Sequence, residues 1–204
     1  MKSRIDRLMT SAQQVLLAIA VLAFAQLGAT QSVPPVAEHI HPAEPVASSD
    51  DVLGAIQVDF SLLNAAGRTV TAEDFRGRYF LLAFGYTRCT DVCPLMAANM
   101  AMTIRQTASE LVGIFISVDT ERDDVVSSNA YASAFGDGML GLGGTHEQVA
   151  EAAKNFQVSF AVTKTQHSYT VQHSSHLFLV DPQGELADVF AMNANPADIA
   201  AAVQ

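Results

Sequence analysis

The sequence predicts an α/β domain in which one layered sheet is covered by helices on both of its faces. Two apolar runs of strand length, RYFLLAFGY at 78–86 and LVGIFISVD at 111–119, suit central strands that are buried on both sides. Segments with helical spacing follow both runs, and the clearest hairpin pattern lies near the C-terminus. This order of elements is typical of an α/β sheet rather than an all-α or all-β domain.

Shorter patterns place the elements of the first half of the domain. Residues 55–75 predict an N-terminal β-hairpin around Ala65-Ala66-Gly67, after which Thr71 caps a short turn. The run at 78–86 is the first central strand, and PLMAANMAMTIRQTASE at 94–110 predicts the helix that follows it.

The second half continues the same alternation. Helices are predicted at 122–136 and 145–156, and the second of them opens on a capping-box residue, Thr145. Residues 176–192 predict a hairpin around a Pro-Gln-Gly turn, and Pro196 suits the first turn of a last helix.

Composition limits the number of domains and the kinds of partner. The chain has 204 residues, half of them hydrophobic, which indicates one folded domain with appendages. Its formal charge is −10, and nucleic-acid binders instead cluster Lys and Arg along phosphates. Two cysteines are too few for a disulfide scaffold, so they form one clip, a redox couple or part of a metal site.

The first 25 residues have the pattern of an export signal. Basic residues precede an apolar run from Val15 to Ala25, which is short for a membrane span of about 20 residues. We expect residues 1–25 to be a signal peptide; the alternative is an uncleaved membrane anchor from about Ser11 to Thr30. Either reading predicts a periplasmic or other extracytoplasmic location, and an uncleaved segment would attach the protein to the inner membrane. Thiols without a function tend to oxidise in such a compartment.

A proline-rich tether is predicted at residues 26–52. Four of the seven prolines lie within twelve positions there, without any aromatic residue, which favours an extended, disordered segment before a folded domain at 53–204. His39 and His41, with Glu38 and Glu44, could gather a metal ion loosely. We expect them instead to be ordinary polar residues of a solvated linker, since nothing in this segment would hold metal ligands in a fixed geometry.

The two cysteines lie where a buried strand gives way to a helix. In GYTRCTDVCP, Cys89 and Cys93 are four positions apart and Pro94 suits a helix start. Ligand crevices of α/β sheets lie outside the carboxyl ends of strands, and a helix N-terminus stabilises a thiolate. The sulfurs can therefore converge on one ion or bond to each other.

A pair of thiolates suits Cu(I) and accepts zinc, and histidine is the natural third donor. Four histidines lie in the tether, in a helix first turn or in a polar stretch: His39, His41, His146 and His167. His173 and His176 both lie at or before the apolar strand near 176–180, and spacing alone does not choose between them.

Three motifs in order, GYTRCTDVCP, ISVDTERDD and QHSSHLFLVDPQG, resemble the Sco/SenC family of copper-binding proteins from about Leu53 to the C-terminus. The resemblance implies a thioredoxin-like fold with a central mixed sheet. It also implies one copper ion, Cu(I) or Cu(II), bound by Cys89, Cys93 and His173. His176 would then be structural. It also implies a chaperone that helps assemble the binuclear copper centre of cytochrome c oxidase, with the copper-receiving subunit as partner.

Several positions depart from the family pattern or leave alternatives open. Gln172 stands where many members have Asp before the histidine, and Thr90 and Thr120 stand where proline is frequent. Asp91 either orients the copper site or is a solvated loop carboxylate. The methionines Met96, Met100 and Met102 are expected to be core residues rather than a Cu(I) relay.

The rival function is an extracytoplasmic thiol-disulfide oxidoreductase in which Cys89 and Cys93 are the catalytic redox pair. The same low-pKa thiol that binds copper attacks disulfides, and the pair can also form a disulfide in the metal-free protein. Against this, the chain has no proline between Pro94 and Pro182, where typical thioredoxins carry a cis-proline. A copper- or redox-responsive regulator would use the same site. Another copper chaperone or a thiol reductase is a further possible partner.

Overall fold

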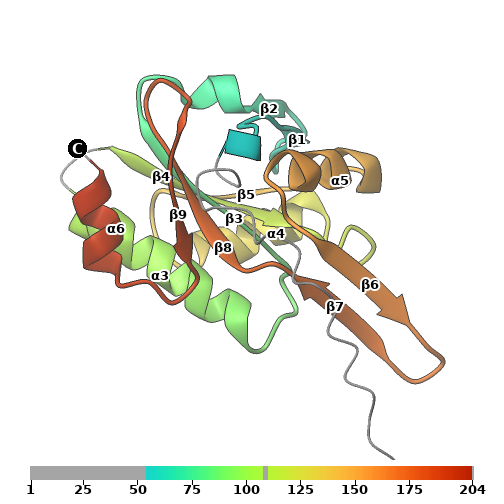
Figure 1. Cartoon of the computed structure of the whole chain (residues 1–204). Coiled ribbons are helices and arrows are strands. Elements are labelled where there is room, and N and C mark those ends of the chain that lie inside the picture. The colour runs from blue at the N-terminus through green and yellow to red at the C-terminus, as the bar shows by residue number, and fades with distance from the viewer. Residues whose placement is uncertain (1–53, 108–109, 204) are drawn as a thin grey trace, which may run out of the picture. The chain divides into compact units, whose positions relative to one another are not determined.

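The structure is a computed structural model that describes residues 54–107 and 110–203 (Figure 1). The predicted leader at 1–25 and tether at 26–52 lie outside the described residues. The chain divides into two units, Met1–Pro45 and Val46–Gln204, and all described residues belong to the second. Within the described residues, no helix has the length and apolar character needed to cross a bilayer.

The domain is built on a five-stranded mixed sheet in the order β5-β4-β3-β8-β9. Three neighbouring strands are parallel: β3 (Tyr79–Gly85), β4 (Leu111–Ser117) and β5 (Met139–Leu142). The other two, β8 (His176–Val180) and β9 (Leu186–Ala191), run antiparallel to β3 and to each other. The two apolar runs become the central strands β3 and β4, which confirms the predicted mixed sheet.

Helices cover both faces of this sheet, as predicted. One core cluster joins Leu81 and Phe115 of the sheet to α3 (Val92–Gln106), α4 (Val125–Ser133) and α6 (Pro196–Ala202). A second cluster joins the opposite side chains, Phe80 and Phe84 among them, to α5 (His146–Asn155). The side chains of a strand alternate between its two faces, so a continuous apolar run serves two cores at once.

The predicted N-terminal hairpin is present as β1 (Ser61–Leu63) and β2 (Thr69–Thr71), followed by the short 3₁₀ helix η1 (Ala72–Phe75). The backbone N–H of Thr71 donates to Oδ2 of Asp74 over 2.7 Å, which caps this helix. Phe60, just before β1, and Leu62 within it are buried in the core cluster that also contains the apolar side chains of α5.

Strand β5 was not among the predicted elements. It is only four residues long, too short to show a periodic pattern. Its Gly141 is fixed by packing instead, because a Cβ atom there would lie 2.1 Å from the carbonyl oxygen of Ser128 in α4.

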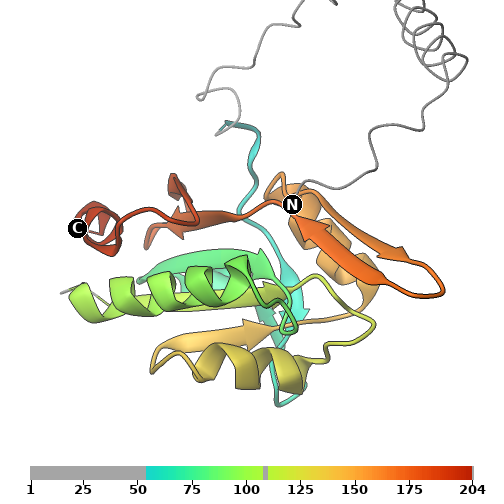
Figure 2. The same ribbon diagram turned by 90° about the horizontal axis from the view of Figure 1, so that it is seen from below.

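A second hairpin was also not predicted. Strands β6 (Phe160–Lys164) and β7 (Tyr169–His173) pair antiparallel, with Phe160 opposite His173. Figures 1 and 2 both show this hairpin projecting from the rest of the domain. Five of its ten residues are exposed and only Val171 is buried, although side chains along both strands alternate between covered and exposed positions. Strands of five residues with so little apolar burial give a weak sequence signal. The hairpin decides where His173 lies.

Candidate metal centre

The cysteines lie where β3 gives way to α3, as predicted. Cys89 precedes the helix, and its N–H donates to the carbonyl of Tyr86 over 3.3 Å in a tight turn. Cys93 lies in the first turn of α3, which begins at Val92. Its backbone N–H approaches Sγ of Cys89 at 3.4 Å, so the helix N-terminus faces the first sulfur.

His173 reaches the second cysteine from a distant part of the chain. It is the last residue of β7, and its Nε2 lies 3.4 Å from Sγ of Cys93. The ring of Tyr86 packs edge-on against the imidazole, with the ring centroids 5.9 Å apart. The structure therefore brings together two of the three predicted ligands.

The hydrogen bonds of His173 determine which ring nitrogen is free. Nδ1 lies 2.9 Å from the carbonyl oxygen of Ser174, which can only accept a hydrogen bond. Nδ1 must therefore carry the proton, which leaves Nε2 with a lone pair directed at Cys93. Burial lowers the pKa of His173, and the bond to Ser174 opposes part of that shift. The imidazole is thus kept neutral, the form that binds metals.

The two thiols differ in their ease of ionisation. Burial raises the pKa of Cys89, but the backbone N–H groups of Cys93 and Asp91 outweigh it and hold the pKa below its usual value. Burial, and then the neighbouring Cys89, raises the pKa of Cys93 to about 12. The exposed fractions are 7% for Cys89 and 0% for Cys93. Cys89 is therefore the thiolate that solvent and partners meet first.

The donor atoms present suit a soft metal ion. Both cysteines are free, and the Cys93–His173 separation of 3.4 Å can be spanned by one ion with bonds of about 2.0–2.3 Å. Within residues 54–107 and 110–203, however, no three Cys, His, Asp or Glu side chains are arranged to hold an ion together. Binding of one ion by all three predicted ligands would therefore need these side chains to rearrange.

The remaining histidines of the described segments lie elsewhere. His146 opens α5, and His167 is exposed in the turn between β6 and β7. His176 begins β8 opposite Ala191 and is exposed, with its ring 6.4 Å from that of Phe178. Of the two histidines that spacing left equal, the fold places His173 beside Cys93 and leaves His176 exposed. His39 and His41 lie outside the described residues.

Asp91 and the methionines take different places around the loop. Asp91 is the exposed N-cap residue of α3, and its side chain makes no capping hydrogen bond. Met96 and Met100 are fully buried in the core, as predicted. The prediction is wrong for Met102, which is 39% exposed and lines a surface pocket with Leu95, because it falls on the outer side of α3.

The site also depends on a glycine that the sequence reasoning missed. A Cβ atom at Gly85 would lie 2.6 Å from the ring of Phe115 and 3.2 Å from Sγ of Cys93. Only glycine leaves room for both groups at the end of β3. A glycine that interrupts an apolar strand run directly before the cysteine loop is the signal that could have indicated this.

Comparison with known proteins assigns the chain to a family. The SCO1/SenC family model matches residues 49–204, the whole of the described domain. The chain belongs to the SCO1/SenC family. The fold is thioredoxin-like, as the resemblance implied, with the mixed sheet and flanking helices shared with solved Sco structures.

Relatives within the SCO1/SenC family cover most of this domain. The mouse mitochondrial SCO2 homologue is 34% identical over 155 residues, which are 72% of this chain and 61% of that protein. The copper-bound crystal structure of Arabidopsis thaliana ScoI has a TM-score of 0.67 and 30% identity, covering 72% of this chain and 94% of that one. BsSco, described as having a disulfide switch and as one of the Sco cytochrome c oxidase assembly proteins, has a TM-score of 0.57 and 26% identity, covering 72% and 91%.

Proposed function

We propose that this protein is a copper chaperone that binds one copper ion through Cys89, Cys93 and His173. The observation that carries the proposal is the approach of Nε2 of His173 to Sγ of Cys93, with Nδ1 occupied by a backbone carbonyl. A neutral imidazole aimed at a cysteine sulfur beside a second, more acidic cysteine is a donor set for a soft metal. Copper is bound in the related Arabidopsis structure.

Cu(I) and Cu(II) are expected to depend on the three donors to different extents. Two thiolates can hold Cu(I) alone, whereas the imidazole adds the borderline donor that Cu(II) favours. Cys89 supplies the thiolate that is easier to form, and an incoming ion would displace the proton of Cys93. The site can therefore accept copper in either state and release it when a partner competes for the thiolates.

The proposed recipient is the copper-receiving subunit of cytochrome c oxidase. BsSco is described as a cytochrome c oxidase assembly protein, and this chain shares its fold at 26% identity. We further propose a periplasmic or other extracytoplasmic location, with the N-terminal segment acting as a signal peptide or as an inner-membrane anchor. Another copper chaperone or a thiol reductase would load or reduce the site.

Copper titration of the reduced full-length protein tests the proposal. We expect one Cu(II) ion to bind tightly in the wild type, and binding to be strongly weakened in His173→Ala. His176→Ala is the matched control, because His176 is an exposed histidine only three positions away. Weak binding by the wild type, or binding that is indifferent to His173, would contradict the assignment.

One observation favours a second candidate, a dithiol reductase. The pKa of Cys89 is lowered and that of Cys93 is raised to about 12, as in a pair with one attacking and one resolving thiol. The Cys89 thiolate would attack a partner disulfide and release one partner thiolate. Cys93, losing its proton, would then attack the mixed disulfide. The products are a Cys89–Cys93 disulfide and a fully reduced partner.

A reductase assay separates the two candidates. A dithiol reductase would reduce a disulfide-bonded recipient domain without copper present and would do so in His173→Ala as well. A chaperone would transfer copper to the same domain only after that domain is reduced. Copper transfer to the reduced domain would support the chaperone function. Reduction of the domain by a protein that does not bind copper would support the dithiol reductase instead.

A further inference from the structure

Both halves of the proposed copper site are hydrogen-bonded to one short loop that neither half contains. The loop follows β4 and includes Asp119 and Asp123, both buried, with 0% and 7% of their surface exposed. Buried carboxylates need partners to compensate for lost hydration. Their partners here are the segments that carry the cysteines and the histidine.

Asp123 holds the cysteine side. One of its carboxylate oxygens, Oδ2, accepts the backbone N–H of Thr87 at 2.7 Å, and the other accepts the Thr87 hydroxyl at 2.6 Å. The hydroxyl of Ser117 also donates to Oδ2 at 2.7 Å. Thr87 lies two residues before Cys89, so these bonds fix the start of the cysteine loop against the end of β4.

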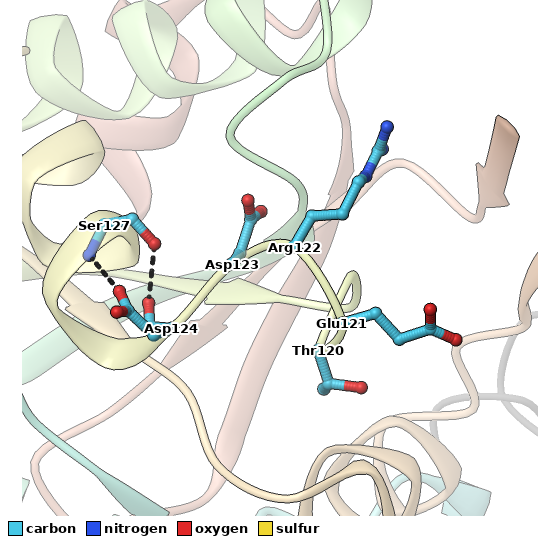
Figure 3. A pocket seen from close by; sticks show the side chains of 6 residues that line it. All are labelled: Thr120, Glu121, Arg122, Asp123, Asp124 and Ser127. Carbon is cyan, nitrogen blue, oxygen red and sulfur yellow. Dashed lines mark hydrogen bonds between the residues drawn. The ribbon is translucent and has the colours of Figure 1, made fainter.

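The next residue in the chain does not share this role. Figure 3 shows Asp124 turned back to Ser127, whose N–H it accepts at 2.7 Å as the N-cap of α4, while Asp123 points away from this pair. The two neighbouring carboxylates therefore do different things: Asp124 caps a helix, and Asp123 clamps a distant loop.

Asp119 holds the histidine side. It accepts the hydroxyl of Tyr169 at 2.6 Å and forms an ion pair with Arg122 at 2.5 Å. The guanidinium of Arg122 lies over the Tyr169 ring, 3.6 Å from its centroid. The partner strand of the projecting hairpin is tied to the same loop by the ion pair between Lys164 and Glu121.

Tyr169 is on the strand face that carries His173. Side chains at positions i, i+2 and i+4 of a strand share one face, so Tyr169, Val171 and His173 point the same way. Thr170 and Gln172 point outward and are exposed. Anchoring Tyr169 and burying Val171 therefore fix the rotation of β7, and with it the direction of the imidazole.

Ser117 connects the carboxylate of Asp123 to the backbone of Asp119. Its hydroxyl accepts the backbone N–H of Asp119 at 3.3 Å while it donates to Asp123. The cysteine side and the histidine side are thus joined through one buried network rather than through separate contacts.

We infer that Asp119 and Asp123 are positioning residues that set the separation between the cysteine loop and His173. This inference deepens the proposed copper-binding function and rests on it for its consequence in metal affinity. Asp123 acts through Thr87 on the cysteines, and Asp119 acts through Tyr169 on the histidine. The two carboxylates should therefore affect different donors.

Two conservative variants of the full-length protein separate these arms. Tyr169→Phe removes only the hydroxyl that donates to Asp119. Its matched control is Tyr131→Phe, because the buried hydroxyl of Tyr131 has no hydrogen-bond partner among the described residues. Thr87→Val removes the hydroxyl that donates to Asp123 at nearly constant shape, and Thr87→Ser retains it.

The first readout needs no metal. In the reduced protein, nuclear Overhauser contacts between the Cys93 β-protons and the His173 ring report their separation. We expect these contacts in the wild type, Tyr131→Phe and Thr87→Ser, and weaker contacts in Tyr169→Phe and Thr87→Val. Loss in Thr87→Val with recovery in Thr87→Ser assigns the effect to the hydroxyl.

The second readout is copper affinity. Tyr169→Phe should weaken Cu(II) binding by about 10- to 100-fold, the range for residues that orient a ligand, and affect Cu(I) much less. Thr87→Val should weaken the binding of both Cu(I) and Cu(II), because both ions are bound by the cysteines.

The inference is overturned if Tyr169→Phe matches Tyr131→Phe, and Thr87→Val matches Thr87→Ser, in both readouts. Should Tyr169→Phe not fold, the Thr87 pair tests the shared network alone. A wild type that shows the proton contacts and binds no copper would refute the proposed function, and the contacts in the variants would still decide the positioning role.

Discussion

The Nε2 atom of His173 lies 3.4 Å from Sγ of Cys93, although 80 positions separate the two residues in the sequence. One atom comes from the first turn of a helix and the other from the end of a projecting hairpin strand. The contact joins a neutral imidazole to a fully buried thiol. Changes at either end should therefore alter what the site binds before they alter the fold.

Cys93→Ser is expected to abolish tight copper binding and leave the domain folded. A hydroxyl is a poor ligand for Cu(I), yet serine is close to cysteine in size and can still bond to Nε2 of His173. Copper stoichiometry and circular dichroism measure the two effects. Thr90→Ser, an exposed change in the same loop, serves as control. Tight copper binding by Cys93→Ser would show that the ligand assignment is wrong.

His173→Ala is expected to weaken Cu(II) binding more than Cu(I) binding. Two thiolates suffice for Cu(I), so the imidazole matters most to Cu(II). Competition titrations with a chelator for each ion, run beside His176→Ala, give the two ratios. Equal losses for both ions would contradict this division between the donors.

Alkylation should distinguish the two thiols over a pH series. The pKa of Cys89 is lowered from an ordinary 9.0, so its thiolate forms, and its rate levels off, at a pH below that of a free thiol. The pKa of Cys93 is raised to about 12, so its rate should still be climbing at pH 10. Peptide mass spectrometry after iodoacetamide treatment measures both rates.

The denatured protein is the control for this series, because both thiols should then react alike. Faster modification of Cys93 than of Cys89 in the folded, metal-free protein would contradict the assigned order of ionisation.

Gly85→Ala should damage both stability and the metal site. The added methyl group would lie 2.6 Å from Phe115 and 3.2 Å from the Cys93 sulfur, and overpacking of this kind costs about 1–3 kcal/mol. The free energy of unfolding in denaturant and the copper affinity should both fall. Gly54→Ala, where nothing lies within 4 Å of the added group, should change neither. An unaltered Gly85→Ala protein would mean that the loop relaxes freely.

The central sheet and the position of the cysteines could be predicted from the sequence because both rest on local patterns. The apolar runs that become β3 and β4 are long enough to identify a buried strand, and Pro94 marks the helix start beside the cysteines. Strand β5 was not predicted because its four residues are too few to show the two-residue hydrophobic period of a strand. Met102 was misplaced because one apolar residue in a helix does not reveal which side is covered.

The family resemblance pointed to His173, but spacing by itself left His173 and His176 equal. They are three residues apart, and both lie at or just before the start of the same apolar strand. In the fold, His173 ends β7 opposite Phe160 and faces Cys93, whereas His176 begins β8 opposite Ala191 and is exposed.

By itself, then, the sequence determined the α/β class, the cysteine loop at a strand end and the short list of candidate histidines. Only the tertiary structure decided which histidine meets Cys93, and through which ring nitrogen. It also revealed that Asp119 and Asp123 tie the two halves of the site to one loop. The physical reason is that strand and helix periods are written in neighbouring residues, while a contact across 80 positions depends on strand register and buried hydrogen bonds.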